Sequence, residues 1–218
     1  MKKLVLSATA IMSSVFFAHS AAAATNLSQD YNFVSGGIQY NHYKDKAYKK
    51  AENAKKSDMT RHTAGGYLRG SWNFYDNMFV EARAEGTKNG DLKETGALAG
   101  VGYFMPVNDK MSVYGLAGYS AEHVKLGKSK VTEKGLTGEV GAKYQVMDNW
   151  TVEPAVRYAK YHKAGYEFRL GNNFKVTDHV SIEANVARNN VKLMYGENHD
   201  QEVKLKETNF ELGARYNF

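Results

Sequence analysis

The chain has 218 residues, and its 29 Lys+Arg against 23 Asp+Glu give a formal net charge of +6. Cysteine is absent, which excludes disulfide scaffolds, cysteine-ligated metal centres and thiol catalysis. With 2 prolines, 20 glycines and 15 tyrosines, the composition is unlike that of disordered or collagen-like chains. No segment after residue 24 is apolar enough for a membrane helix, but a membrane β-barrel stays possible because its strands are only half apolar.

The first 24 residues are expected to be a cleaved secretory signal peptide. Residues 1–3 supply a short basic start, and residues 4–18 form a largely apolar run. The alanines at 21–24 are the small residues that a signal peptidase requires. The apolar run is too short for a membrane anchor, so we expect residues 25–218 to form the mature protein as a single domain.

From residue 32 onward, polar and apolar side chains alternate with a period of two, which predicts β-strands. In the clear example 78–87, Val80 and Ala82 share one face, while Glu81 and Arg83 share the other. Ten such runs can be counted: 32–43, 62–74, 78–87, 94–105, 111–123, 135–146, 150–161, 164–175, 179–193 and 203–218.

Short and long connections between these runs take turns along the chain. The short ones contain Asp or Asn, as tight hairpin turns do: 75–77, 106–110, 147–149 and 176–178. The others are mostly longer polar stretches: 44–61, 88–93, 124–134, 162–163 (a short exception) and 194–202. This order predicts an all-β fold, a transmembrane up-and-down antiparallel β-barrel with ten strands, or eight or twelve as alternatives.

The apolar face is expected to meet lipid. Aromatic residues of that face gather at both ends of the runs, as interfacial belts do. The belt near the short turns comprises Trp72, Phe74, Tyr103, Trp150, Phe174, Tyr216 and Phe218, and the other comprises Tyr40, Tyr119, Tyr158 and Tyr166. Between the belts many residues of this face are alanine. A soluble lipocalin-like barrel is the alternative, but it would need bulkier side chains to fill its interior.

The last run ends on an aromatic residue and keeps its apolar residues on one face: Phe210, Leu212, Ala214, Tyr216 and Phe218. This pattern resembles the assembly signal of Gram-negative outer-membrane proteins. With the segments 108–115 and 139–144, it makes the chain similar to the small barrels grouped with the OmpA transmembrane domain and the opacity- and porin-like proteins. OmpA-type domains have eight strands, however, where this chain has ten runs.

The resemblance implies a monomer in the cell outer membrane. Its partners would be membrane lipid, lipopolysaccharide and, through the C-terminal strand, the barrel-assembly machinery.

The polar face is expected to line the interior of the barrel. It carries a near balance of bases and acids: Arg69, Glu81, Arg83, Glu85, Glu139, Lys143, Glu153, Arg157, Glu167, Arg169, Glu183, Glu211 and Arg215. Ten strands close at a radius of roughly 10 Å, so these long side chains would fill most of the lumen. Buried charges must be paired, which predicts an internal ion-pair network and a mostly plugged lumen.

A narrow pore is the alternative, because glycines on the same face would leave gaps between the charged residues: Gly100, Gly102, Gly141, Gly171 and Gly213.

The long connections 44–60 and 124–134 each have a net charge of +3. Their lysines are Lys44, Lys46, Lys49, Lys50, Lys55, Lys56, Lys125, Lys128, Lys130 and Lys134. Basic outer loops would be attracted to lipopolysaccharide phosphates, although they can also serve solubility alone. The sequence therefore predicts a role in surface integrity, lipopolysaccharide contact or adhesion, with a narrow porin-like channel for small solutes as the alternative.

Catalytic, cofactor and metal-binding residues are not assigned. Gly96, Gly100 and Gly102 lie within a run, with the wrong spacing for a dinucleotide-binding loop. The segment 118–120 lacks the second glycine of a nucleophile elbow. No basic-aromatic motif of a nucleic-acid-binding module is present. We therefore expect neither an enzyme nor a nucleic-acid-binding protein.

Overall fold

A computed structural model describes residues 26–44, 62–126, 129–195 and 201–218. The expected signal peptide lies outside these residues. The elements are α2 (Asn26–Gln29), β1 (Phe33–Tyr43), β2 (His62–Tyr75), β3 (Met78–Asn89), β4 (Leu92–Asn108), β5 (Met111–Leu126), β6 (Ser129–Met147), β7 (Trp150–Lys160), β8 (Ala164–Lys175), β9 (Val180–Tyr195) and β10 (Gln201–Asn217). No helix in the described part of the chain is long and apolar enough to cross a membrane.

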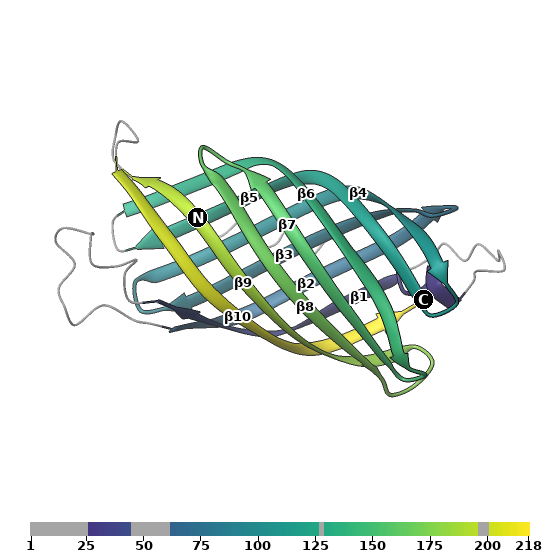
Figure 1. Cartoon of the computed structure of the whole chain (residues 1–218). Helices are drawn as coiled ribbons and strands as arrows, with labels where there is room; N and C mark the ends of the chain where they lie inside the picture. The colour runs from purple at the N-terminus through teal and green to yellow at the C-terminus, as the bar shows by residue number, and fades with distance from the viewer. Residues whose placement is uncertain (1–25, 45–61, 127–128, 196–200) are drawn as a thin grey trace.

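The strands form one closed antiparallel barrel in which every strand pairs with its neighbours in sequence (Figure 1). Strand β1 closes the barrel by pairing with β10, for example Ile38 opposite Leu212 and Ser35 opposite Arg215. Short turns lie at one end, where Figure 1 also places α2 and the C-terminus. The predicted ten-stranded up-and-down barrel is confirmed. We call the end that holds α2 and the C-terminus the inner end and the opposite one the outer end.

The strands extend further at the outer end than the sequence analysis predicted. Strands β3 and β4 pair up to Asn89 and Leu92, so the predicted long stretch 88–93 is a tight hairpin, in which Gly90 adopts a φ of +57°. Strands β5 and β6 pair up to Leu126 and Ser129, so 124–134 is mostly strand rather than loop. Both faces are largely polar here. The hydrophobic alternation that marks a strand is therefore lost while the backbone pairing continues.

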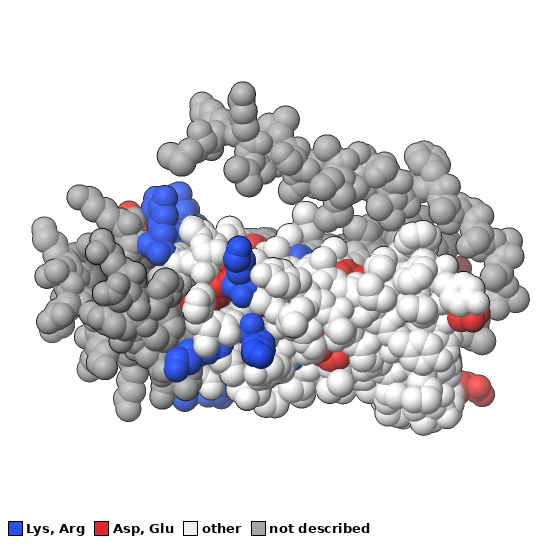
Figure 2. Space-filling model, turned by 90° about the horizontal axis from the view of Figure 1, so that it is seen from above, with Lys and Arg blue, Asp and Glu red and all other residues white. Residues whose placement is uncertain are grey.

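Apolar side chains lie on the outside of the barrel and ionic ones on the inside. The exposed fractions of Leu136 and Ile38 are 68% and 67%, whereas Glu139 and Glu183 are exposed by only 2% and 1%. On the face seen in Figure 2, the inner half is nearly free of Lys and Arg, and basic side chains gather toward the outer end. This arrangement excludes the soluble lipocalin-like alternative, because a soluble barrel buries its apolar face.

The aromatic residues expected at the two belts lie on the outer surface. At the inner end Trp72, Tyr103 and Tyr216 are exposed by 40%, 54% and 44%, and toward the outer end Tyr119 and Tyr166 by 49% and 46%. Amphipathic rings at two levels are the arrangement that lipid–water interfaces favour.

Candidate functional site

The inner end of the lumen is filled by the segment that precedes β1. The Tyr31 side chain is 1% exposed and stacks on Phe104, with ring centroids 4.1 Å apart. It also contacts Phe79 at 4.8 Å between centroids, and its hydroxyl lies 3.0 Å from the Ser112 Oγ. We refer to residues 26–32 as the N-terminal plug, since this segment occupies the mouth of the barrel.

The basic side chain of Lys143 in the barrel wall contacts the plug at two places. The Lys143 Nζ lies 3.9 Å from the Tyr31 ring centroid and donates a hydrogen bond of 2.5 Å to the Asp30 carbonyl. The sequence analysis placed Lys143 in the internal ion-pair network. In the structure it contacts the plug instead, through a backbone carbonyl and an aromatic ring. Burial raises the pKa of the Asp30 carboxyl above its usual value, and the charge of Lys143 opposes this shift.

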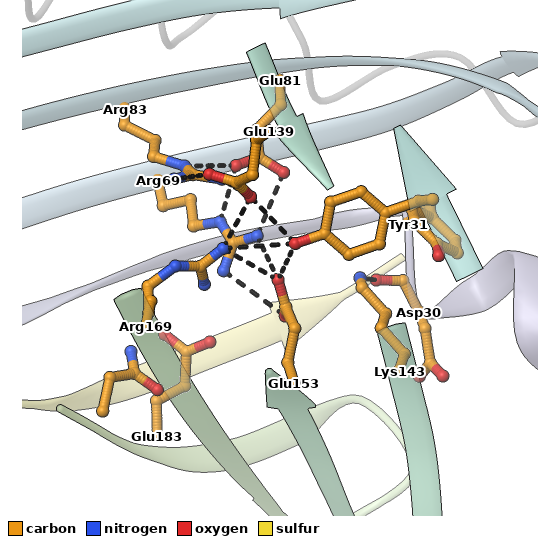
Figure 3. Close-up of polar contacts among 12 residues, drawn as sticks. Asp30, Tyr31, Arg69, Glu81, Arg83, Glu139, Lys143, Glu153, Arg169 and Glu183 are labelled. Carbon is orange, nitrogen blue, oxygen red and sulfur yellow. Dashed lines mark hydrogen bonds and ion pairs between the residues drawn. The ribbon is translucent and has the colours of Figure 1, made fainter. Parts of the chain in front are cut away.

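Next to the plug, toward the outer end, three arginines and three glutamates form a closed ring across the lumen, drawn in Figure 3. We call this set the ionic ring. Its contacts run Glu81–Arg69–Glu153–Arg169–Glu139–Arg83 and back to Glu81. Its N–O distances are 2.8 Å for Arg69 to each of its partners and 2.7 Å for Arg83 to Glu139.

The ionic ring is buried and electrically balanced. None of its side chains is exposed by more than 17%. The Tyr114 hydroxyl also donates to Glu139 and Glu153, at 2.8 and 3.0 Å. Every charge therefore has opposite charges on both sides, the condition under which buried ions are tolerated.

Two further ion pairs lie beside the ionic ring. Arg157 pairs with Glu167 at 2.6 Å, and Arg215 pairs with Glu183 near the plug. Two glutamates predicted for the network make neutral contacts instead. Glu85 accepts a hydrogen bond from the Gln39 Nε2 at 3.0 Å, and Glu211 accepts one from the Asn185 Nδ2 at 3.0 Å.

Aromatic side chains fill space beside the lumen glycines that the sequence analysis took for gaps in a pore. The Phe79 ring occupies the position that a Cβ on Gly102 would take, and the Tyr114 ring lies 2.6 Å from that position on Gly141. These contacts, with the ionic ring and the plug, weigh against an open path along the barrel.

The sequence analysis missed several lumen residues. Tyr31 precedes the first strand, and no pattern indicated that it enters the barrel. Tyr114 and Phe104 are apolar or aromatic residues on the inner face, where only polar residues were expected. Glu94 and Glu207 fit the inward alternation of β4 and β10, which is the signal that could have found them.

The C-terminal residues singled out by the resemblance lie on the outer face of β10. The exposed fractions of Phe210, Leu212, Tyr216 and Phe218 are 50%, 53%, 44% and 40%, and Ala214 is exposed as well. Their function as an assembly signal stays a prediction.

Part of the predicted basic patch lies outside the described residues: Lys46, Lys49, Lys50, Lys55, Lys56 and Lys128. Lys44 directly follows β1 and is exposed, while Lys125 lies in β5, and Lys130 and Lys134 lie in β6. Lys125, Lys130 and Lys134 are therefore strand residues, and the prediction that they lie in a loop is wrong.

Four outward-facing lysines stand in one row across β3, β4, β5 and β6. Lys88 is the direct partner of Lys93, Lys93 of Lys125, and Lys125 of Lys130. Directly opposite side chains have their Cβ atoms about 4.5–5.5 Å apart, so these four ammonium groups repel each other. We call this set the lysine row. The sequence analysis missed Lys88 and Lys93, because only the strand register brings them beside Lys125.

The model of the outer membrane protein beta-barrel domain family matches residues 8–168, more than half of the chain. The chain belongs to the outer membrane β-barrel family. It is thus an outer-membrane protein, and its apolar outer surface faces lipid. No curated protein matches the chain by sequence.

Several solved barrels resemble this outer membrane β-barrel protein in structure. The outer membrane protease OmpT from Escherichia coli has 10% identity and a TM-score of 0.51, covering 86% of this chain and 94% of its own. The attachment invasion locus protein Ail of Yersinia pestis has 16% identity and a TM-score of 0.41, covering 85% of this chain and 97% of its own. The KdgM porin has 13% identity and a TM-score of 0.39, covering 84% of this chain and 99% of its own. At these identities the OmpT similarity supports the fold alone.

Proposed function

We propose that this protein is a non-conducting outer-membrane barrel that binds the phosphates of lipopolysaccharide through its outward-facing lysines. The lysine row carries the proposal. Like charges placed directly opposite each other destabilise a sheet, and bound anions would remove that cost. Surface integrity would follow from this contact, because one protein would bridge several lipid headgroups.

The position of the lysine row fits the phosphorylated part of the outer leaflet. On β5, Lys125 follows the belt residue Tyr119 by six positions, which places it roughly 15 Å beyond the belt in a tilted strand. A second tier of exposed basic residues lies closer to the belt: Lys134, Lys160, Arg188 and Lys206. Long basic side chains can reach from both levels toward headgroup phosphates while their stems cover apolar surface.

The closed lumen supports a binding function over a transport function. The ionic ring, the plug and the aromatic side chains at Gly102 and Gly141 fill the section that a solute would have to cross. The six charges of the ring are paired with one another, so none of them is a free acid or base, and we propose no catalytic role.

Removing two charges from the lysine row tests the binding function. In the variant Lys93→Gln/Lys125→Gln we expect the affinity for lipopolysaccharide vesicles to fall about ten-fold, with a smaller dependence on salt. The matched control, Lys110→Gln/Lys175→Gln, removes two exposed lysines at the inner end and should bind as the wild type does. Equal loss in both variants would show that only net charge matters and would refute a site.

Planar-bilayer recordings test the closed lumen separately. We expect no discrete conductance steps from the wild-type protein. Steady single-channel steps would overturn this part of the proposal in favour of a narrow porin-like channel.

A further inference from the structure

A second region of the lumen, between the ionic ring and the outer end, has a different charge balance. It encloses a cavity of about 50 Å³, which is room for a few water molecules. Five carboxylates and a single guanidinium, that of Arg157, contribute to its wall: Glu85, Glu94, Glu122, Glu167 and Glu207. We call this the acidic cavity. Unlike the ionic ring, it carries a large excess of negative groups.

Only one of the five carboxylates has a cationic partner among the described residues, the Glu167 that pairs with Arg157. Three of the others, Glu85, Glu94 and Glu207, accept hydrogen bonds from neutral donors. The Glu207 carboxylate accepts hydrogen bonds from the Asn189 Nδ2 at 2.7 Å and the Asn41 Nδ2 at 3.4 Å. Such bonds leave each carboxyl group with free acceptor capacity and supply no counter-charge. Buried charges of one sign call for a counter-charge.

Two of these carboxylates converge over a glycine. A Cβ on Gly96 would lie 2.6 Å from the Glu85 Oε1 and 2.9 Å from the Glu122 Oε2. The missing side chain therefore gives both carboxylates room at the same spot. Glu122 makes no hydrogen bond or ion pair within the described ranges, so its carboxyl group is open to a ligand in the cavity.

An amide oxygen beside this pair is also without a partner. Gln39 lines the cavity and is 3% exposed, and its Nε2 donates to Glu85 and to Asn41. Its Oε1 accepts no hydrogen bond from the described residues. A buried amide oxygen normally has a donor, so this atom is an independent sign that a donor-bearing ligand belongs in the cavity.

We infer that the acidic cavity binds a slender organic amine, with a primary ammonium group between Glu85, Glu122 and the Gln39 Oε1. An ammonium supplies both the positive charge that the carboxylates lack and the N–H donors that the amide oxygen lacks. The described residues contain no group of three or more His, Cys, Asp or Glu side chains placed to hold a metal ion, which favours an amine over a divalent metal. Further carboxylates, Glu94 and Glu207, could take a second ammonium of a diamine.

This inference concerns the interior of the barrel and does not rest on the proposed lipopolysaccharide contact. It is tested by calorimetry on the full-length folded protein in detergent at neutral pH. The probe is putrescine, a diamine with two positive charges. Magnesium chloride provides the same charge on a point-like ion, and 1,4-butanediol provides the same length without charge. We expect saturable binding of putrescine, with affinities at least ten-fold lower for magnesium and no measurable binding of the diol.

The variant Glu85→Gln/Glu122→Gln removes the central carboxylates while keeping their size. We expect it to weaken putrescine binding at least ten-fold. The matched control, Asp91→Asn/Asp148→Asn, removes two exposed carboxylates from turns and should bind within two-fold of the wild type. Near-ultraviolet circular dichroism and the heat-dependent shift of the barrel on gels establish that each variant is folded.

Three results would overturn the inference: no saturable binding of putrescine, tighter binding of magnesium than of putrescine, or equal weakening in the two variants. The first would mean that protons or water compensate the carboxylates. The second would indicate a metal site, and the third a non-specific attraction of cations to the protein surface.

Discussion

The ionic ring makes a strong prediction about Glu153, because one carboxylate there joins two arginines. Its Oε1 lies 2.8 Å from Arg69 and 3.1 Å from Arg169, and the side chain is 7% exposed. The substitution Glu153→Gln keeps the shape and removes the charge, which leaves three arginines facing two glutamates. Breaking a buried pair by removing one partner costs about 3–5 kcal/mol.

Glu85→Gln is the matched control for this substitution. It is the same chemical change on the same face of the barrel, but Glu85 has no ion-pair partner among the described residues and lies close to Glu122. Removing its charge relieves repulsion with Glu122. We therefore expect the free energy of unfolding to rise, or to fall by no more than about 1 kcal/mol. The two variants should therefore differ in stability by about 3 kcal/mol.

Urea unfolding in lipid vesicles, followed by the fluorescence of Trp72 and Trp150, measures the difference. With a slope of about 2 kcal/mol/M, a loss of 3–5 kcal/mol lowers the midpoint of Glu153→Gln by roughly 2 M. The midpoint of Glu85→Gln should stay within roughly 0.5 M of the wild type. If both midpoints fall equally, the lumen glutamates act only as space-filling polar groups, and the reasoning from charge pairing is refuted.

Packing at the inner end gives two further predictions. Gly102→Ala should lower the stability by about 1–3 kcal/mol, because its Cβ would collide with the clamped Phe79 ring. At Gly115 a Cβ would meet nothing within 4 Å, so Gly115→Ala should leave the urea midpoint unchanged or raise it, and a loss there would contradict the argument. Tyr31→Phe should cost about 1 kcal/mol through the hydrogen bond to Ser112, whereas Tyr31→Ala should cost about 3–5 kcal/mol; equal midpoints would show that the plug does not pack.

The sequence predicts the barrel well wherever one face of a strand meets lipid. There, each alternate residue must be apolar, and Glu81 or Arg83 between two alanines or valines can only face inward. Beyond the membrane this constraint ends. Around Lys93 and Lys125 both faces of the strand are polar, so alternation carries no signal although the backbone pairs remain. For this reason the alternation pattern could not predict where β3 to β6 end on the outer side.

Which charges meet inside the lumen depends on register and reach, and the alternation of one strand contains neither. Arg69 and Glu153 are 84 residues apart, and only closure of the barrel brings them to 2.8 Å. The plug was missed for a related reason. Tyr31 lies before the first alternating run, and its burial follows from the pocket that Phe79 and Phe104 form on two other strands.

The charge balance along the lumen separates a structural role from a binding role. Charges that only hold a barrel together should be neutral in sum at every level, since each unpaired buried ion costs stability. The ionic ring meets this condition with three arginines and three glutamates. The acidic cavity does not meet this condition, because five glutamates share one arginine. Two of these glutamates converge at Gly96, which has no side chain. A positively charged ligand beside Glu122 would restore the balance in the acidic cavity, so the excess of carboxyl groups there supports the inferred amine site.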